Sequence, residues 1–305
     1  MSGNRPVAIG ILILALFSIV RAEEPSKMQL VLLGTGYPYP SAERAGPSCA
    51  VMAGDRIFIV DAGRGVGMRL AAVGNPWQQI AAVFITHLHS DHIDGLPDLF
   101  HNAWQFGSGR PFELYGPAGI RKAADGILQF YEADIHIRRD LTEKLRPQGA
   151  RINAHEMQEG VVYESDGVRV IAFAADHHPV TPAFGFRFES GRHSIVISGD
   201  TRPNEGLIRN SANADILVCE AYAGSSSSSV ADGARPWSIR DYHTSAAEAG
   251  EVAEKAKVKT LVLTHLIPAN APEKYFLEEA KTTFKGKILV GRDLMRIDSA
   301  GAPGP

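Results

Sequence analysis

The sequence has little cysteine and little net charge, and each shortage argues against a class of protein. Only two of the 305 residues are cysteine, Cys49 and Cys219, and both stand in apolar segments. Disulfide-built scaffolds are much richer in cysteine, so we expect two buried free thiols. The formal net charge of −3 argues against a large electrostatic surface for nucleic acid, because such binding needs many phosphate contacts. Nucleic acid is therefore a disfavoured partner, although the charge does not exclude it.

Long apolar runs are also scarce, and the longest stands at the N-terminus. Residues 7–20 read "VAIGILILALFSIV", after a positive charge at Arg5 and shortly before Glu23. This is the layout of a secretory signal peptide, and the run is shorter than the roughly 20 residues that span a bilayer comfortably. We expect residues 1–22 to be removed, which leaves no membrane partner and a periplasmic or secreted protein. An intact mass beginning at Glu23, measured on protein from the native host, would test this expectation.

The rest of the chain has the composition of one globular unit. Hydrophobic residues make up 45% and charged residues 21% of the sequence, and no repeat or long linker divides it, so residues 23–305 are predicted to form a single domain. "QLVLLGTG", "SCAVMA" and "RIFIVDAG" are typical of short strands, and later runs alternate with helical patterns. Ser245 and Glu248 occupy capping-box positions before one such helix. We predict an α/β fold in which helices cover sheets.

Five apolar runs end in residues that can do chemistry. In α/β proteins, active sites gather where the carboxyl ends of strands meet, and a buried charge without a partner is costly. We therefore expect these side chains to lie together. The runs end at His87, at Asp176–His177–His178, at Asp200, at Glu220 and at His265.

The segment "THLHSDH" (residues 86–92) has the densest group of metal-capable side chains. His87 and His89 are two apart in an extended segment, so both rings can point the same way. Asp91 and His92 follow directly after Ser90. Zinc binds imidazole nitrogen and carboxylate oxygen, and a catalytic zinc site leaves one position for water. Two close clusters of such ligands favour two neighbouring ions.

These residues resemble the signature of the metallo-β-lactamase fold superfamily. "VDAG" at Asp61, "DHHPVTPAFGFRF", "SGDT" and "LTHL" resemble further motifs of that family, and together they cover nearly all of the chain after residue 22. The resemblance implies a four-layer αββα sandwich with two zinc ions, manganese or iron being alternatives. It implies one ion on His87, His89 and His177, a second on Asp91, His92 and His265, and Asp200 bridging them.

The third histidine of that set falls on either His177 or His178. We prefer His177, because the family spacing to "PVTPA" fits it better and because Pro179 restricts the backbone of the residue before it. The sequence leaves both histidines as candidates.

Within the superfamily, several motifs resemble ribonuclease Z and its arylsulfatase-like relatives. They are "LLGTGYPYP", "LYGPAGI", "CEA" and "HTSAAEAGEVAEKAKVKTLVLTHL". The resemblance implies that His243 assists catalysis and that Glu220 orients it, with Asp91 as a further catalytic residue. The chain departs from ribonuclease Z in its export signal. It also departs in having no obvious basic, Gly/Pro-rich arm, since residues 132–165 are mixed in charge.

The implied charges favour an anionic substrate. Two zinc ions, balanced by Asp91, Asp200 and a bridging hydroxide, leave a net charge of about +1, and zinc makes hydroxide available near neutral pH. We predict an exported dinuclear zinc hydrolase of small anionic esters, either phosphodiesters or aryl sulfates. The alternatives are a lactonase or β-lactamase-like hydrolase of a neutral cyclic substrate, and a non-catalytic metal-binding protein. A homodimer is left open.

Two further interpretations concern residues around this set. The segment "AGSSSSSVADGARPWSIRDY" is typical of a flexible linker, or it acts as a lid that brings Trp237 or Tyr242 to an aromatic leaving group. Four other histidines have no metal-capable neighbours in the sequence and are interpreted as surface or capping residues. They are His101, His136, His155 and His193.

Overall fold

The computed structural model describes residues 28–224 and 239–299. The signal-peptide prediction for residues 1–22 and the cleavage before Glu23 lie outside these ranges. Most of the serine-rich segment, including Trp237, lies outside them as well. These interpretations therefore stay predictions. Within the described ranges, none of the helices has the length and apolar character needed to cross a membrane.

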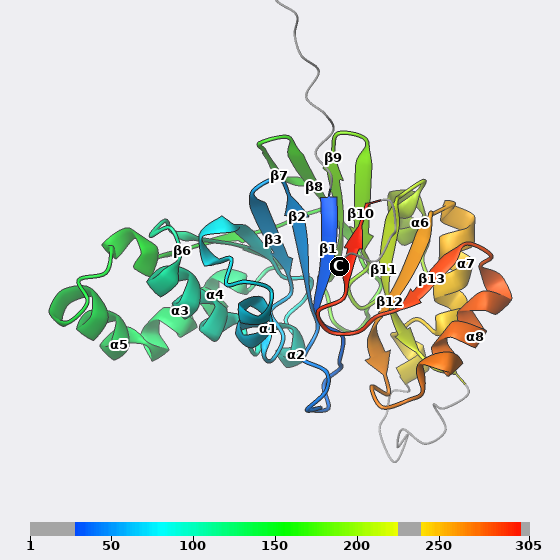
Figure 1. The fold of residues 1–305 in the computed structure, drawn as a ribbon, viewed down its shortest axis with the longest axis horizontal. Helices are drawn as coiled ribbons and strands as arrows, with labels where there is room; N and C mark the ends of the chain where they lie inside the picture. Colours follow the sequence, from blue (N-terminus) through cyan, green and yellow to red (C-terminus); the bar gives the residue numbers. More distant parts are fainter. Residues whose placement is uncertain (1–27, 225–238, 300–305) are drawn as a thin grey trace, which may run out of the picture.

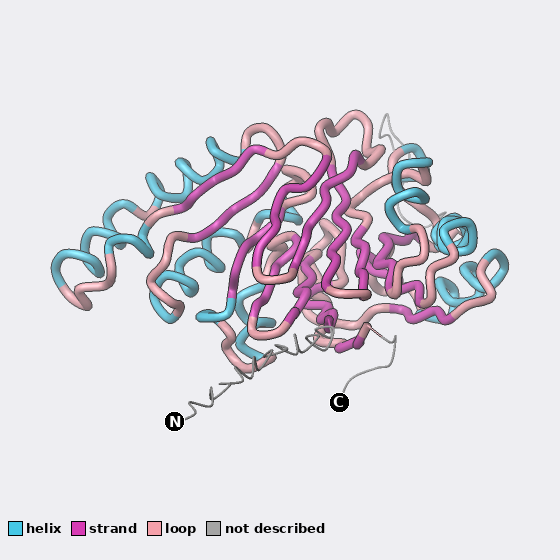
Figure 2. The backbone as a smooth tube through the Cα atoms, turned by 90° about the horizontal axis from the view of Figure 1, so that it is seen from above, coloured by secondary structure: helices cyan, strands magenta, loops and turns pink. Residues whose placement is uncertain are grey.

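Two seven-stranded mixed sheets pack face to face, and helices cover the outer face of each (Figures 1 and 2). This is the predicted four-layer αββα sandwich. The first sheet has the order β14 (Arg296–Asp298), β1 (Met28–Gly34), β2 (Ser48–Ala53), β3 (Arg56–Val60), β4 (Ile80–Phe84), β5 (Phe112–Gly116) and β6 (Ile152–Glu156). The second has the order β13 (Lys287–Val290), β12 (Thr260–Ile267), β11 (Ile216–Tyr222), β10 (His193–Ile197), β9 (Phe184–Ser190), β8 (Val168–Ala174) and β7 (Gly160–Ser165).

The helices divide between the two outer layers. The first sheet carries α1 (Val66–Ala72), α3 (Leu96–Phe106) and α4 (Ile120–Phe130), and the second carries α6 (Glu205–Ser211), α7 (Ala246–Ala256) and α8 (Glu273–Thr283). The remaining short helices are α2 (Ser90–Ile93), α5 (Glu132–His136), the 3₁₀ turns η1 (Trp77–Gln79), η3 (Pro147–Ala150) and η4 (Ile239–Asp241), and the π turn η2 (Ile137–Leu141).

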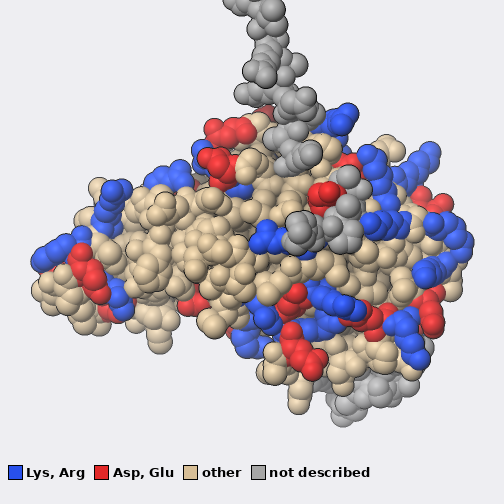
Figure 3. Space-filling model, in the orientation of Figure 1, with Lys and Arg blue, Asp and Glu red and all other residues tan. Residues whose placement is uncertain are grey.

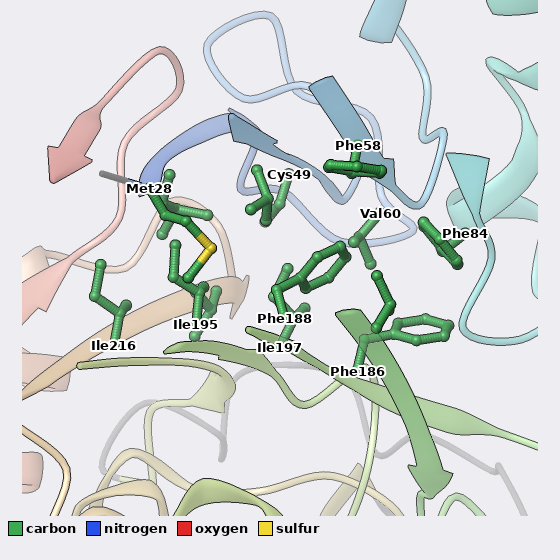
Figure 4. Packing of buried hydrophobic residues seen from close by; sticks show 14 of the residues in the cluster. Met28, Cys49, Phe58, Val60, Phe84, Phe186, Phe188, Ile195, Ile197 and Ile216 are labelled. Atoms are coloured by element: carbon green, nitrogen blue, oxygen red, sulfur yellow. The ribbon is translucent and has the colours of Figure 1, made fainter. Parts of the chain in front are cut away.

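The central core explains why the strands of both sheets are so apolar. In β1, Leu30 and Leu32 point into the core between the sheets, while Val31 and Leu33 point to the helices on the other side. Strands alternate their side chains between two faces, so a strand covered on both faces needs apolar residues at every position. Aromatic rings fill the centre from both sheets (Figure 4), and the ring centroids of Phe84 and Phe186 lie 5.5 Å apart.

The helix predicted after residue 245 begins as expected. The Ser245 hydroxyl accepts a hydrogen bond from the Glu248 backbone N–H at 3.2 Å, and the Glu248 carboxylate accepts one from the Ser245 N–H at 2.8 Å. This capping box fixes the start of α7. Just before this helix, the Tyr222 N–H donates to the Thr244 carbonyl at 3.0 Å, so the segment that carries His243 lies beside β11 of the second sheet.

The structure confirms the prediction for the two cysteines and corrects two other predictions. Cys49 and Cys219 are buried and unpaired as expected, and burial raises the pKa of both thiols. His101 is buried at 8% exposure with its ring 4.1 Å from that of Tyr131, so it is neither a surface nor a capping residue. The reason is that Tyr131, between α4 and α5, and Asp134 of α5 lie against its ring.

The second correction concerns where two strands end. Glu220 and His265 were expected at strand ends, but β11 and β12 continue past both of them to Tyr222 and Ile267. The pairing of β11 with β12 shifts register between Glu220 and Ala221. This irregularity lets polar side chains at 220 and 265 face the site while the strands continue in hydrogen-bonded contact.

Candidate metal centre

One edge of the sandwich collects the residues that the sequence singled out. This edge lies at the bottom of Figure 1, where the chain leaves several strands of both sheets. His87 and His89 follow β4, Asp91 and His92 lie in α2, and His177, Asp200 and His265 come from the second sheet. The structure thus brings all seven predicted ligands together, although they are spread over residues 87–265.

The seven side chains form two groups that share one carboxylate. In the first group, the His89 Nδ1 atom lies 3.0 Å from His87 Nε2 and 3.3 Å from His177 Nε2. In the second group, His265 Nε2 lies 3.4 Å from Asp91 Oδ2, and His92 Nε2 lies 3.6 Å from the same oxygen. These groupings match those expected for two neighbouring ions.

The Asp200 carboxylate lies between the two groups. Its Oδ2 atom is 3.8 Å from His87 Nε2 and 3.9 Å from His177 Nε2 on one side. On the other side it is 3.3 Å from the Nε2 atoms of both His92 and His265. A single carboxylate within reach of both groups has the position that a bridging ligand would need.

In three of the histidine rings, Nδ1 faces away from the cluster, and a polar contact to this atom sets the orientation of the ring. His92 Nδ1 donates to Asp61 Oδ2 at 2.8 Å, and His177 Nδ1 donates to the Tyr242 carbonyl at 3.0 Å. Thr86 Oγ1 lies 3.0 Å from His87 Nδ1. With Nδ1 engaged in this way, the Nε2 atom of each ring is left for the centre of the cluster. Metal-binding histidines are usually oriented by such partners.

Backbone strain also marks this edge. Asp61 and His265 have φ angles of 60° and 45°, in the left-handed region that side chains other than glycine seldom adopt. Such conformations persist where the surrounding structure enforces them, and they concentrate at functional sites. Here they turn a carboxylate that follows β3 of the first sheet and an imidazole in β12 of the second sheet toward the cluster.

The donor atoms of the second group satisfy a physical test for a cation site. Asp91 Oδ2, His92 Nε2 and both ring nitrogens of His265 are buried and have no hydrogen-bond partner among residues 28–224 and 239–299. Buried polar atoms are ordinarily paired, and unpaired ones cost free energy. Imidazole nitrogens and carboxylate oxygens converging within 4.8 Å of one another are the ligands that zinc takes. The residues therefore fit a metal ion.

The electrostatics of the site reflect crowding of histidines around carboxylates. Burial lowers the pKa of His87 and of His177. Burial alone would also lower the pKa of His265, but the Asp200 carboxylate beside it raises that pKa to about 9. Burial acts in the opposite sense on Asp200, and the neighbouring His265 and His92 rings hold its pKa well below the usual value. The carboxylate is thus kept ionised, as a ligand must be.

Glu220 and His243 form a second kind of arrangement at the same edge. His243 Nδ1 hydrogen-bonds Glu220 Oε2, and the other oxygen of Glu220 accepts from the Thr201 backbone N–H. His243 Nδ1 lies 4.0 Å from Asp200 Oδ2. Burial raises the pKa of Glu220 and lowers the pKa of His243 to about 4. The helix cap at this point is Ser245, so His243 does not serve as the N-cap of α7.

The structure distinguishes the two neighbouring histidines at 177 and 178. His177 is 1% exposed and its ring faces the cluster, whereas His178 is exposed to solvent. The sequence reasoning did not use Thr86 or the carbonyl of Tyr242 as orienting groups. Thr86 stands directly before His87, and that position was the only available signal for it.

A model of the Beta-lactamase superfamily domain matches residues 56–266. The chain belongs to the metallo-β-lactamase superfamily. It is 40% identical over 280 residues to ribonuclease Z of Mycobacterium bovis strain BCG / Pasteur, covering 89% of this chain and 98% of that protein. It is 38% identical over the same length to ribonuclease Z of Mycobacterium tuberculosis strain H37Rv, with the same coverage of both chains. This member of the superfamily is therefore a hydrolase with ribonuclease Z homologues.

Solved structures of other superfamily members share the fold. The Bacillus subtilis metallo-β-lactamase fold protein YhfI has a TM-score of 0.67 and 24% identity, covering 89% of this chain and 99% of its own. The short form of human tRNase Z also has a TM-score of 0.67, at 23% identity, covering 88% and 98%. A diphosphatase of the PhnP family has a TM-score of 0.62 at 19% identity, covering 88% and 97%.

Proposed function

We propose that this superfamily member is a zinc-dependent phosphodiesterase. One zinc ion would be held by His87, His89 and His177, and a second by Asp91, His92 and His265, with Asp200 bridging them. When bound, ions at these positions would neutralise the charge of a phosphodiester and supply hydroxide near neutral pH. Manganese or iron would fit the same nitrogen and oxygen donors.

The observation that carries the proposal is the Glu220–His243 pair beside the bridging position. Glu220 accepts from the Thr201 N–H with one oxygen and bonds the His243 ring with the other. The ring cannot turn without breaking this bond, and its Nε2 atom is left to act on a substrate. Burial lowers the pKa of His243, and an anionic ester bound beside the ring would oppose this effect by favouring the protonated imidazolium. The protonated Nε2 could then stabilise charge on the leaving oxygen or donate a proton to it as the ester bond breaks.

A phosphodiester fits this arrangement better than the alternatives. A lactone is neutral, whereas two zinc ions at this site would leave a net positive charge that favours an anionic ester. A purely structural metal site would have no use for a second, buried Glu–His pair next to its ligands. An aryl sulfate would satisfy the same charges, and sulfate esters therefore remain the second candidate chemistry.

We propose that the substrate is a small phosphodiester rather than a long RNA. On the helical extension beyond α4, the arginines are already paired within the protein: Arg138 with Asp134 at 3.0 Å and Arg139 with Asp140 at 2.6 Å. On the face drawn in Figure 3, charges of both signs are interspersed. Paired arginines release few counterions on binding phosphates. A transfer-RNA precursor is the competing substrate, which the ribonuclease Z homologues support.

A substrate panel and one variant test the proposal. The panel comprises bis(p-nitrophenyl) phosphate, p-nitrophenyl phosphate, p-nitrophenyl sulfate, a lactone, nitrocefin and a transfer-RNA precursor, each with zinc-loaded protein. We expect the first to have the highest kcat/KM among the small substrates. His243→Ala should lower kcat by roughly 100-fold with metal content unchanged, and more for poorer leaving groups. Glu220→Gln should have a smaller effect in the same direction.

His101→Ala is the matched control, because it removes a buried imidazole that lies outside the cluster. It should keep kcat near the wild-type value. If His243→Ala loses a metal ion, the histidine is a ligand and the assignment of roles is wrong. A wild-type kcat with full metal content would show that the ring has no catalytic role.

A further inference from the structure

A loop of residues 35–46 connects β1 to β2 and touches the second ligand group at both of its ends. At its start, the Thr35 carbonyl accepts a hydrogen bond of 3.0 Å from the N–H of Leu266, the residue after His265. At its end, Gly46 packs so tightly that a Cβ atom there would lie 3.1 Å from the Asp91 carbonyl oxygen. In Figure 1 the loop is the blue segment at the lower edge, near the orange turn after β12. The loop therefore flanks the position of Asp91 and His265.

Half-buried charged groups hold this loop in one shape. The Asp293 carboxylate accepts from the N–H groups of Thr35 at 3.0 Å and Ala45 at 2.7 Å. The Arg44 guanidinium donates to the carbonyls of Gly291 at 2.8 Å and Ala269 at 3.2 Å. These bonds tie the loop to the turn after β12 and to the segment after β13. A loop fixed in this way can present side chains to a ligand at little entropic cost.

Two tyrosines on the loop lie beside each other, Tyr37 half-buried and Tyr39 exposed. The rings of Tyr37 and Tyr39 stack with centroids 6.5 Å apart and planes inclined by 28°, and Tyr39 is 72% exposed. They line a cavity of about 220 Å³ with Pro40, Ser41, Ala269 and Asn270. The rings offer flat apolar faces, and the hydroxyl of Ser41 and amide of Asn270 supply hydrogen-bonding groups.

We propose that Tyr37 and Tyr39 form a stacking subsite for a planar aromatic group of the ester substrate. The subsite rests on the proposed phosphodiesterase function, since it explains which ester is taken. Aromatic faces bind flat rings by stacking, with little dependence on which base or substituted ring is bound. A cavity of this volume suits one ring system. A nucleobase and an aryl group share this chemistry. The polar groups beside the rings match the donors and acceptors on a nucleobase edge.

Binding measurements on zinc-loaded protein test the subsite without requiring turnover. The probes are thymidine 5′-monophosphate, p-nitrophenyl phosphate and ethyl phosphate, which carry a nucleobase, an aryl ring and no ring. In the Tyr37→Ala/Tyr39→Ala variant, the Kd of a ring-bearing probe should rise roughly tenfold, as expected for a lost base stack. The Kd of ethyl phosphate should change less than about twofold. Loss confined to thymidine 5′-monophosphate identifies the nucleobase, and loss confined to p-nitrophenyl phosphate identifies an aryl group.

Two control variants distinguish the loss of these two rings from other effects of substitution. Tyr37→Phe/Tyr39→Phe keeps both rings and should retain wild-type binding, while Phe130→Ala removes an 80% exposed aromatic side chain from α4 and should change nothing. Equal weakening of all three probes, or weakening of none, would overturn the subsite. The proposed function fails separately, if the wild type does not hydrolyse bis(p-nitrophenyl) phosphate. In that case the ratio of Kd values still decides whether the tyrosines stack on a ring.

Discussion

The second sheet carries a buried aspartate at each of two opposite ends, and the two have opposite surroundings. Asp200 follows β10 and Asp215 precedes β11, and each is 3% exposed. Asp215 accepts from the Ser194 N–H at 2.9 Å, from Lys259 Nζ at 2.6 Å and from His193 Nδ1 at 3.2 Å. These donors satisfy the hydrogen-bonding capacity of the Asp215 carboxylate, and this explains how it can be buried.

Asp200 is buried to the same extent, but the polar groups around it do not satisfy one another's hydrogen-bonding capacity. Its Oδ2 atom has ring nitrogens of five histidines within 4.0 Å. Several neighbouring polar atoms, including Asp91 Oδ2 and His265 Nε2, have no hydrogen-bond partner in the part of the chain that the structure describes. Burial alone therefore does not distinguish a structural carboxylate from a site carboxylate. What distinguishes them is whether the described protein groups supply the remaining hydrogen-bond partners, as they do around Asp215.

The same substitution, aspartate to asparagine, at each of the two positions gives the largest expected difference in activity. Asp200→Asn should lower kcat/KM on a phosphodiester by about 10³-fold or more, because it removes a charge shared by both ion positions. Metal content measured on the purified variant should fall below that of the wild type at both positions. Asp215→Asn is the matched control and should retain activity and metal. Equal activities for the two variants would contradict the bridging role of Asp200.

A smaller effect is expected for a residue that contacts a proposed ligand but is not itself a ligand. Asp61 accepts from the Thr86 N–H at 2.8 Å and from His92 Nδ1 at 2.8 Å, so Asp61→Asn places an amide where an acceptor is needed. Zinc affinity, measured by competition with a chromogenic chelator, should weaken by roughly 10- to 100-fold. At saturating zinc, kcat should recover most of its wild-type value. A kcat that stays low at full metal occupancy would mean that Asp61 acts on the chemistry itself.

The smallest effect concerns stability at the structural end. Asp215→Asn should lower the free energy of unfolding by about 1–3 kcal/mol at pH 7, since it weakens charge-assisted hydrogen bonds to a buried group. Burial alone would raise the pKa of Asp215, but the hydrogen bonds from Lys259 and Ser194 hold it below the usual value. A depressed pKa stabilises the fold above the unfolded value of about 3.9, and this stabilisation is lost as the pH falls through the folded value.

Urea unfolding of both proteins at pH 7 and pH 3 would measure this contribution. The difference between wild type and Asp215→Asn should be largest at pH 7 and should shrink at pH 3. A difference that grows at low pH would show that folding raises the pKa of Asp215 instead of lowering it. It would also remove the contrast between this carboxylate and Asp200.

Much of this molecule could be predicted from local sequence patterns. Strands such as "SCAVMA" show continuous apolar character because both of their faces are covered, and the capping box at Ser245 and Glu248 is a purely local signal. The dense run from His87 to His92 indicates a metal site because imidazole nitrogens and carboxylate oxygens are the ligands that zinc takes. The assignment of the later residues rested on resemblance, since no local pattern ties His265 to His87.

Only the tertiary structure decided which atoms meet and how they are oriented. It placed His177 rather than His178 in the cluster, and it set Tyr242 behind that ring although 65 residues separate them. It also carried β11 and β12 past Glu220 and His265, which the pattern had placed at strand ends. The physical reason is the same in each case. Apolar periodicity specifies which face of an element is buried, whereas the partner of a buried polar group depends on which other elements the chain brings to the same edge.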